Sequence, residues 1–181
     1  KNPATWEGVT VANGRVTAIE WGDKHLAGEL NLSGFKALTK VNVSRNALTS
    51  LNIDGDAAIT RLDAQRNKLS GVSLDGCTGL KTLNIYKNRI TEFTLTGTPI
   101  IETVNISNNY LVALDVANST SLKTLNCQGN HLEMLKVEYC TALKNLYCGY
   151  NKLTGLTLVG VEALQNLNID DNEISNLIIS N

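Results

Sequence analysis

Residues 80–100 read LKTLNIYKNRITEFTLTGTPI, and the spacing within this 21-residue stretch recurs along most of the chain. Steps of 21 residues from Asn88, in either direction, meet Asn every time. The seven positions are Asn46, Asn67, Asn88, Asn109, Asn130, Asn151 and Asn172. The positions eight, five and three residues before each Asn, and two residues after it, are apolar in every copy. A period this regular predicts a repeat protein in which each unit forms one coil.

The columns of the repeat predict the local structure. Around Leu83 and Ile85 apolar and polar residues alternate, which is typical of a short strand with its apolar side chains pointing inward. A single coil cannot bury these side chains, so neighbouring coils must stack. The Asn amide both donates and accepts, so it can satisfy backbone groups at a bend. We therefore interpret all seven Asn as a structural ladder. Gly recurs where each coil turns back, at Gly55, Gly76, Gly97 and Gly160.

The unit LxxLxLxxNxLxxLxLxxxxx is the leucine-rich repeat pattern. We expect a leucine-rich repeat solenoid with one parallel strand per 21-residue coil, mostly β with little helix on the convex side. The domain prediction is a single solenoid of seven repeats over residues 34–181, preceded by an N-terminal cap and an irregular first coil over residues 1–33. Asn13-Gly14 predicts a hairpin in the cap.

The two ends of the solenoid are expected to differ. Val16 and Ile19 imitate the apolar columns one residue out of step, and Trp6 and Trp21 are predicted to cover the first coil. The last coil ends at Ile178-Ile179, in phase with its predecessors. An uncovered coil exposes core and unpaired strand groups. We therefore expect further chain, or another surface, to cover this end.

Composition excludes several functions. The chain has 16 Lys plus Arg against 17 Asp plus Glu, a balance that argues against nucleic-acid binding. No apolar run approaches the ~18 residues that a membrane span needs. No nucleophile–base pair, paired acid or phosphate loop occurs, and His25 and His131 are isolated, so we predict no enzyme, no catalytic residue and no cofactor.

The cysteines and one acidic group are the candidates for a metal site. Cys127 and Cys148 lie 21 residues apart, and Cys77 and Cys140 lie 63 apart, so each pair shares a column. In-register side chains on parallel strands make poor disulfides, and no CxxC or Cys/His cluster occurs, so we predict buried thiols and no metal. A calcium site formed by Asp54, Asp56 and Asp75 is disfavoured because the pattern does not repeat.

A 21-residue repeat with inward Cys at the third strand position, as at Cys127 and Cys148, resembles the internalin J type of leucine-rich repeat protein, a surface protein of Gram-positive bacteria. The resemblance implies a secreted or wall-attached module for adhesion or recognition, located outside a bacterial cell or on its surface.

Binding by a solenoid usually involves outward strand positions that have no core role. This face is basic at its N-terminal end and acidic at its C-terminal end, and Tyr and Arg favour binding hot spots. The predicted ligand-binding residues on the concave face are Arg45, Arg61, Arg66, Tyr86, Lys87, Asn105, Asn126, Tyr147 and Tyr150. We predict a protein ligand, with a host cell surface or matrix as candidates and no nucleic acid. Two alternatives remain open: a glycan-binding module, and a structural spacer that displays another domain.

Overall fold

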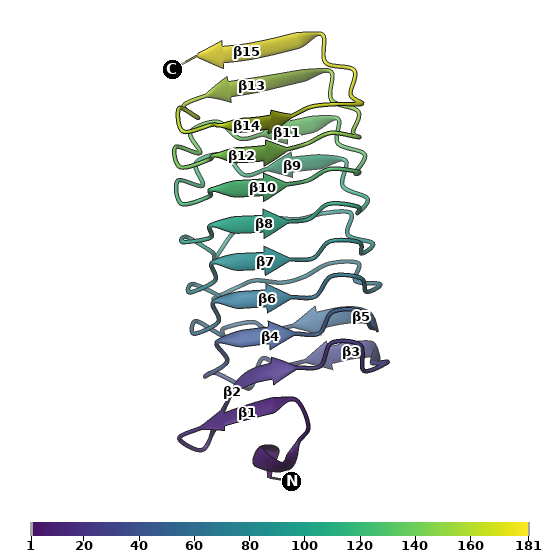
Figure 1. Ribbon diagram of the computed structural model, residues 1–181, viewed down its shortest axis with the longest axis vertical. Helices are drawn as coiled ribbons and strands as arrows, with labels where there is room; N and C mark the ends of the chain where they lie inside the picture. Colours follow the sequence, from purple (N-terminus) through teal and green to yellow (C-terminus); the bar gives the residue numbers. More distant parts are fainter. Residues whose placement is uncertain (1, 181) are drawn as a thin grey trace.

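The computed structural model describes residues 2–180 as a rod of stacked coils, with the N-terminal hairpin at one end and the last coil at the other (Figure 1). One side of the rod is a nine-stranded sheet that is parallel from its second strand onward. In spatial order the strands are β1 (Val9–Ala12), β2 (Arg15–Glu20), β4 (Lys40–Asn42), β6 (Arg61–Asp63), β7 (Thr82–Asn84), β8 (Thr103–Asn105), β10 (Thr124–Asn126), β12 (Asn145–Tyr147) and β14 (Asn166–Asn168). This confirms the solenoid with one parallel strand per coil.

The opposite side of the rod is only partly β. Three strand pairs lie there: β3 (Ala27–Asn31) with β5 (Ala47–Asn52), β9 (Ala113–Asp115) with β11 (Met134–Lys136), and β13 (Gly155–Val159) with β15 (Asn176–Ser180). Within residues 2–180 the single helical segment is the 3-10 turn η1 (Pro3–Thr5). The prediction of short strands and extended turns in place of convex helices is therefore confirmed. No helix in this part of the chain is long and apolar enough to cross a membrane.

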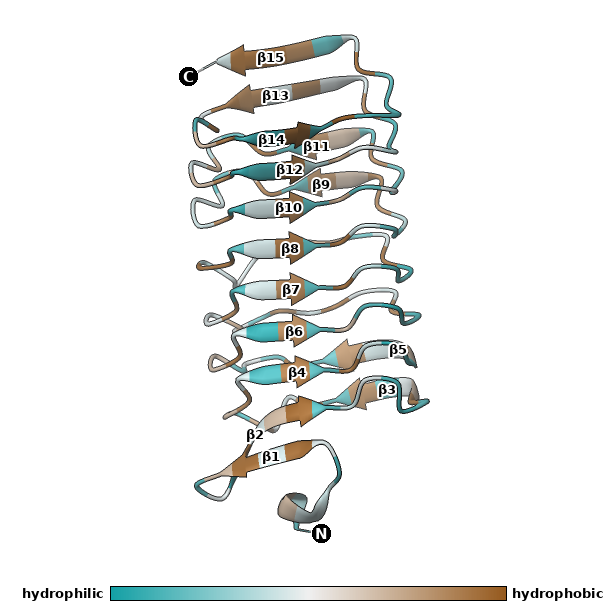
Figure 2. Cartoon of the chain, viewed as in Figure 1, coloured by the Kyte–Doolittle hydropathy of each residue, from teal (hydrophilic) through white to brown (hydrophobic). Residues whose placement is uncertain are grey.

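The core is a column of aliphatic side chains between the two sides. Strand pairing places equivalent residues of successive coils opposite each other, as with Leu62, Leu83 and Val104, all fully buried. Along the strands, apolar and polar positions alternate (Figure 2). Because the register never slips between β4 and β14, every apolar column of the sequence becomes a continuous stripe of the core.

The seven Asn form the predicted ladder. Asn109 is 2% exposed; its Nδ2 donates to the carbonyls of Ile85 (3.1 Å) and Ile106 (3.0 Å), and its Oδ1 accepts from the Ile90 amide (3.1 Å). Each ladder Asn thus joins its own coil to the preceding one, and Asn172 in the last coil makes the same contacts. These bonds satisfy backbone groups that the sheet leaves unpaired.

The N-terminal hairpin turns at Asn13 and Gly14, both with positive φ (50° and 72°), as a tight two-residue turn requires. Ile19 on β2 pairs with Val41 on β4, a separation of 22 residues, so the first coil is indeed one residue out of step. Trp21 packs against the core and its indole N–H donates to the Glu7 carbonyl at 3.0 Å, whereas Trp6 is half-buried. The division at residue 33 stays a prediction.

The last coil is the least covered part of the rod. Leu177 is 41% exposed and Ile179 66%, whereas the equivalent Leu135 and Val137 of an inner coil are buried. Apolar side chains on β15 therefore face solvent at this end. The expectation that something covers them stays a prediction.

Candidate functional site

The nine predicted binding residues occupy two distinct places on the coil. Arg61, Asn105, Asn126 and Tyr147 lie on strands of the large sheet, and Tyr86 lies two residues after β7. We call the outward residues of β4 to β14, together with the residue two positions after each of these strands, the strand face. The other four residues, Arg45, Arg66, Lys87 and Tyr150, follow the strands, in the turn where each coil leaves the sheet.

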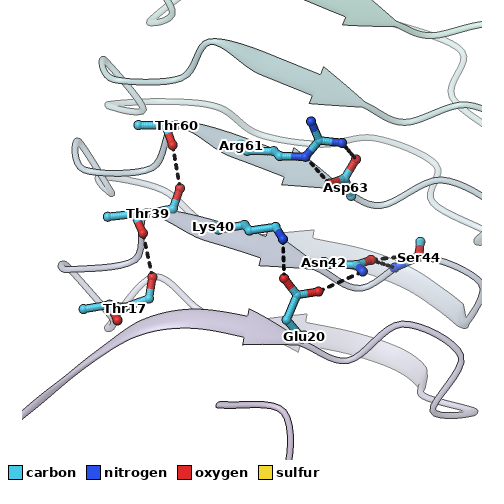
Figure 3. Close-up of polar contacts among 9 residues, drawn as sticks. All are labelled: Thr17, Glu20, Thr39, Lys40, Asn42, Ser44, Thr60, Arg61 and Asp63. Carbon is cyan, nitrogen blue, oxygen red and sulfur yellow. Dashed lines mark hydrogen bonds and ion pairs between the residues drawn. The ribbon is translucent and has the colours of Figure 1, made fainter. Parts of the chain in front are cut away.

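At its N-terminal end the strand face is a network of ion pairs and hydrogen bonds (Figure 3). The Arg61 guanidinium binds the Asp63 carboxylate with two contacts, Nε–Oδ2 at 2.6 Å and Nη2–Oδ1 at 3.0 Å. Lys40 Nζ lies 2.6 Å from Glu20 Oε1, and its hydrogen bond holds the pKa of Glu20 below the usual range. Arg61 is therefore already engaged within its own strand, and the N–H donors that Asp63 does not use are the ones left for a partner.

The two predicted amides are partly committed to the fold. Asn105 Oδ1 accepts from the Ser107 amide (3.2 Å) and hydroxyl (2.6 Å), and Asn126 Oδ1 accepts from the Gln128 amide (3.1 Å). Asn42 makes the same contacts with Ser44. These carbonyl oxygens close the bend after each strand, so at Asn105 and Asn126 a ligand would be recognised by the amide nitrogen.

The tyrosines give the strand face its aromatic surface. Tyr147 is half-buried on β12, on the strand next to Asn126. Tyr86 is also half-buried, and the Arg66 guanidinium lies over its ring, 5.8 Å from the centroid. Contact between an arginine and a ring holds the long side chain in place and lowers the entropy lost on binding. The structure therefore brings together Arg66 and Tyr86, which lie 20 residues apart in sequence.

The turn after each strand forms a second surface. Its left-handed residue stands immediately before each ladder Asn, with φ of 56° at Arg45, 58° at Arg66, 56° at Lys87 and 55° at Tyr150. The residue immediately after the ladder Asn is also outward, because the Asn between them points into the core. We call the residues on either side of each ladder Asn the ridge. In Figure 1 the ridge follows the turns just beyond the arrowheads of β4 to β14.

Five ridge residues were missed by the sequence reasoning: Lys68, Arg89, Tyr110, His131 and Lys152. All five are exposed, and each follows a ladder Asn directly. The Tyr110 and His131 rings stack with their centroids 6.0 Å apart. The missed signal was the column itself, because polar, charged or aromatic residues recur there at six of the seven ladder positions, from Lys68 to Glu173.

Nothing in the described chain is built for metal binding. No group of three or more His, Cys, Asp or Glu side chains in residues 2–180 is placed to hold a metal ion. The four cysteines are free and buried. Burial raises the pKa of Cys127 well above its ordinary value and that of Cys148 to about 12, so both stay protonated, unreactive thiols at neutral pH. The predicted thiol stack is confirmed.

The convex side carries apolar hollows. One of about 540 Å³ is lined by Phe93, Val112 and Met134 among others, where the convex strands are interrupted between β5 and β9. Val112 is 50% exposed and Met134 45%. Nothing in the structure indicates what would fill this hollow, so the strand face and the ridge remain the better candidates.

Comparison with known proteins supports the fold. No family model and no curated protein sequence matches the chain. Among solved structures, the functional domain of InlJ from Listeria monocytogenes, described as including a cysteine ladder, matches 88% of this chain and 36% of its own with a TM-score of 0.75 and 28% identity. The chain is thus similar to a bacterial leucine-rich repeat protein of the internalin J type, and it spans about a third of that protein's length.

Two other structures match at lower identity. YopM from Yersinia pestis, described as a leucine-rich effector protein, shares 20% identity and a TM-score of 0.66 over 90% of this chain and 57% of its own. A structure of the LRIM1/APL1C complex matches 88% of this chain and 34% of its own, with 20% identity and a TM-score of 0.61. At this identity both likenesses concern the fold alone.

Proposed function

We propose that this leucine-rich repeat solenoid is a non-enzymatic recognition module that binds a protein through its strand face. The observation that carries the proposal is the strand face itself. It is a continuous sheet surface whose inward residues form the core, whereas its outward residues combine arginine, amides and tyrosines. Such a surface offers shape-stable contacts at small entropic cost.

The compared proteins support this class of function. One is described as a leucine-rich effector and another as part of a two-protein complex. The likeness to the internalin J type favours a bacterial protein that is secreted or displayed on the cell surface, in an adhesion role. A host cell-surface or matrix protein is then the partner to test first.

A glycan ligand is the second candidate. Thr82, Thr103 and Thr124 form a row of hydroxyls on adjacent strands, beside the amides of Asn105 and Asn126. Hydroxyls and amides of this kind hydrogen-bond sugars, and a tyrosine ring offers a stacking surface. Salt distinguishes the two ligands, because a charged protein interface is weakened by added salt more than a neutral sugar contact.

The test compares two double variants for binding to intact host cells and to a glycan array. Tyr86→Ala with Tyr147→Ala removes the aromatic part of the strand face, and Val112→Ala with Met134→Ala removes exposed apolar residues from the convex side. We expect the first variant to lose about tenfold in affinity or more, as for hot-spot aromatics, and the second to bind like wild type. Equal binding by wild type and both variants would overturn strand-face recognition, and absence of binding by all three would favour the spacer alternative.

A further inference from the structure

The ridge carries charge in a fixed order along the rod. Its first part is basic and consists of Arg45, Arg66, Lys68, Lys87 and Arg89, all exposed. Its middle part holds the stacked Tyr110 and His131, followed by Tyr150 and Lys152. Its last part is acidic, with Asp171 and Glu173 exposed beside the last ladder Asn. Charge therefore changes sign from one end of the ridge to the other.

The basic part is not neutralised by the protein's own acids. The ion pairs formed within residues 2–180 join Lys24 to Glu7, Lys40 to Glu20, Arg61 to Asp63, Lys123 to Glu102 and Lys136 to Asp115. None of the five basic ridge residues takes part in them. Asp23 stands one coil before Arg45, and no ion pair between the two is formed. Five cations on three consecutive coils thus remain available to a partner.

Backbone conformation gives independent support. Arg45, Arg66 and Lys87 hold φ near +56°, a region that costs an ordinary L-residue ~1–2 kcal/mol and that Gly, Asn and Asp enter most readily. Later coils use those very residues at the same turn, with Asn108 (φ 54°), Gly129 (φ 63°) and Asp171 (φ 51°). The turn therefore does not call for long basic side chains. Residues kept in a costly conformation suggest a role other than the turn itself.

We infer that the ridge binds a polypeptide segment whose charge is segregated in the opposite order, with its acidic part on Arg45 to Arg89 and its basic part on Asp171 and Glu173. The inference rests on the proposed protein-binding function and adds the chemistry of the partner. Guanidinium groups suit carboxylates because they can donate two hydrogen bonds at once. The Tyr110–His131 stack receives an apolar or aromatic residue between the two charged parts.

The change of sign also selects the class of partner. A uniform polyanion, such as a sulfated glycan or a nucleic acid, is attracted by the basic part of the ridge but is repelled where it reaches Asp171 and Glu173. A polypeptide can change its charge along its length. From Arg45 to Asp171 the ridge spans six coil steps of ~4.8 Å, about 29 Å, which about nine residues of an extended chain can cover.

The test uses labelled peptides of about nine residues, the length that spans the ridge, and measures their binding by fluorescence anisotropy. One peptide has a glutamate block, a tyrosine centre and a lysine block. A second has the same composition with glutamate and lysine alternating, and the third probe is polyglutamate. We expect the segregated peptide to bind tightest and its affinity to fall with added salt.

The variant set isolates the ridge. Arg45→Asn, Arg66→Asn and Lys87→Asn together remove three cations at positions where Asn suits the backbone. The matched control, Lys81→Asn, Lys123→Asn and Lys144→Asn, makes the same change in net charge at exposed lysines just before the strands. We expect the ridge variant to bind the segregated peptide about tenfold more weakly, from several lost ion pairs, and the control to bind it like wild type.

Three results would overturn the inference: equal binding of the segregated and alternating peptides, polyglutamate binding as tightly as the segregated peptide, or equal losses in the ridge variant and its control. Absence of any peptide binding would overturn it too. The proposed function is judged separately, because a partner lost by the Tyr86→Ala, Tyr147→Ala variant and retained by the ridge variant would leave strand-face recognition intact.

Discussion

Every full coil contains two left-handed turns, and they are filled by different residues. The turn that brings the chain back toward the sheet has Gly55, Gly76, Gly97, Asn118, Tyr139 and Gly160 at its positive-φ position. The ridge turn has Arg45, Arg66, Lys87, Asn108, Gly129, Tyr150 and Asp171. The backbone conformation is the same, yet one column is mostly glycine and the other mostly long side chains.

Space explains the difference. A Cβ added to Gly76 would lie 2.9 Å from Gly55 Cα, and one added to Gly160 would lie 2.7 Å from the Tyr139 ring. Successive coils therefore touch at the turn-back. A Cβ added to Gly129 on the ridge would have the Asn108 side chain as its nearest neighbour, at 3.2 Å. The ridge is also fixed from inside by the ladder Asn, which leaves its outward residues free to vary for recognition.

The largest effect is expected from removing that internal support. Asn109→Ala leaves the Ile85 and Ile106 carbonyls and the Ile90 amide buried in the core without these hydrogen-bond partners. At about 1–3 kcal/mol for each unsatisfied buried group, with some relief from relaxation, we expect a loss of about 4 kcal/mol in the free energy of unfolding. Urea denaturation measures it. Asn172→Ala, in the last and more exposed coil, serves as the control and should cost clearly less; equal losses would contradict the role of burial.

An arginine, as found in the ridge turn, should not be tolerated in the turn that brings the chain back toward the sheet. Gly76→Arg combines the cost of a left-handed L-residue with a collision against Gly55, so we expect a loss of about 3 kcal/mol. Thermal unfolding followed by circular dichroism checks it. Asn118→Gly in the same column is the control and should change the stability by less than about 0.5 kcal/mol. Normal stability of Gly76→Arg would remove the steric distinction between the two turns.

A buried carboxyl beside the turn-back gives the pH-dependent prediction. Asp56 is 1% exposed; its Oδ1 accepts from the Ala58 amide at 3.3 Å, whereas its Oδ2 is buried without a hydrogen-bond partner. Burial raises the pKa of Asp56 to about 6. Because this pKa is above the unfolded value of about 3.9, the neutral form favours folding. The stabilisation is fully present below about pH 4 and is lost as the pH rises through 6.

Asp56→Thr tests this linkage. Thr98 in the same column donates its hydroxyl to the Leu95 carbonyl at 2.7 Å, and a threonine at position 56 could donate to the equivalent Ile53 carbonyl, which it would share with the Cys77 thiol. We expect the variant to gain about 2 kcal/mol at pH 7 and little at pH 4. Denaturation midpoints at the two pH values measure the gain. A gain of the same size at both would show that the ionisation of Asp56 is not its cause.

The sequence alone predicts the features that follow from the regular stacking of coils. Apolar columns, the Asn ladder, the thiol stack and the one-residue offset of the first coil all follow from a fixed period, because stacked coils must place like residues on like. The site was harder to predict. Arginine and lysine are not residue types that indicate a left-handed backbone, so the sequence predicts Arg45, Arg66 and Lys87 on the same face as Arg61 and Tyr147.

A clue to the missed turn was present in the same column. Asn108, Gly129 and Asp171 are the residue types that favour positive φ, and together they indicate a turn at that position. If the conformation of this column is inferred from the residues that favour positive φ, and not from its charged residues, the ridge is distinguished from the strand face. The hydrogen bonds that commit Asn105 and Arg61 depend on side-chain geometry, which a repeat pattern does not contain.

The smallest predicted effect is a gain, and it bears most directly on what the ridge is for. Lys87→Asn replaces a long side chain at φ 56° with a residue that tolerates this region, so we expect the protein to become more stable by about 1 kcal/mol. The melting temperature should rise by a few degrees, as measured by calorimetry.

Lys81→Asn changes an exposed lysine on the same coil outside the ridge turn. It is the control and should leave the melting temperature nearly unchanged. A gain in stability accompanied by weaker binding of a charge-segregated peptide would mean that the chain gives up stability at this position for recognition. A loss of stability would instead show that Lys87 supports the turn, and would remove the backbone argument for a binding ridge.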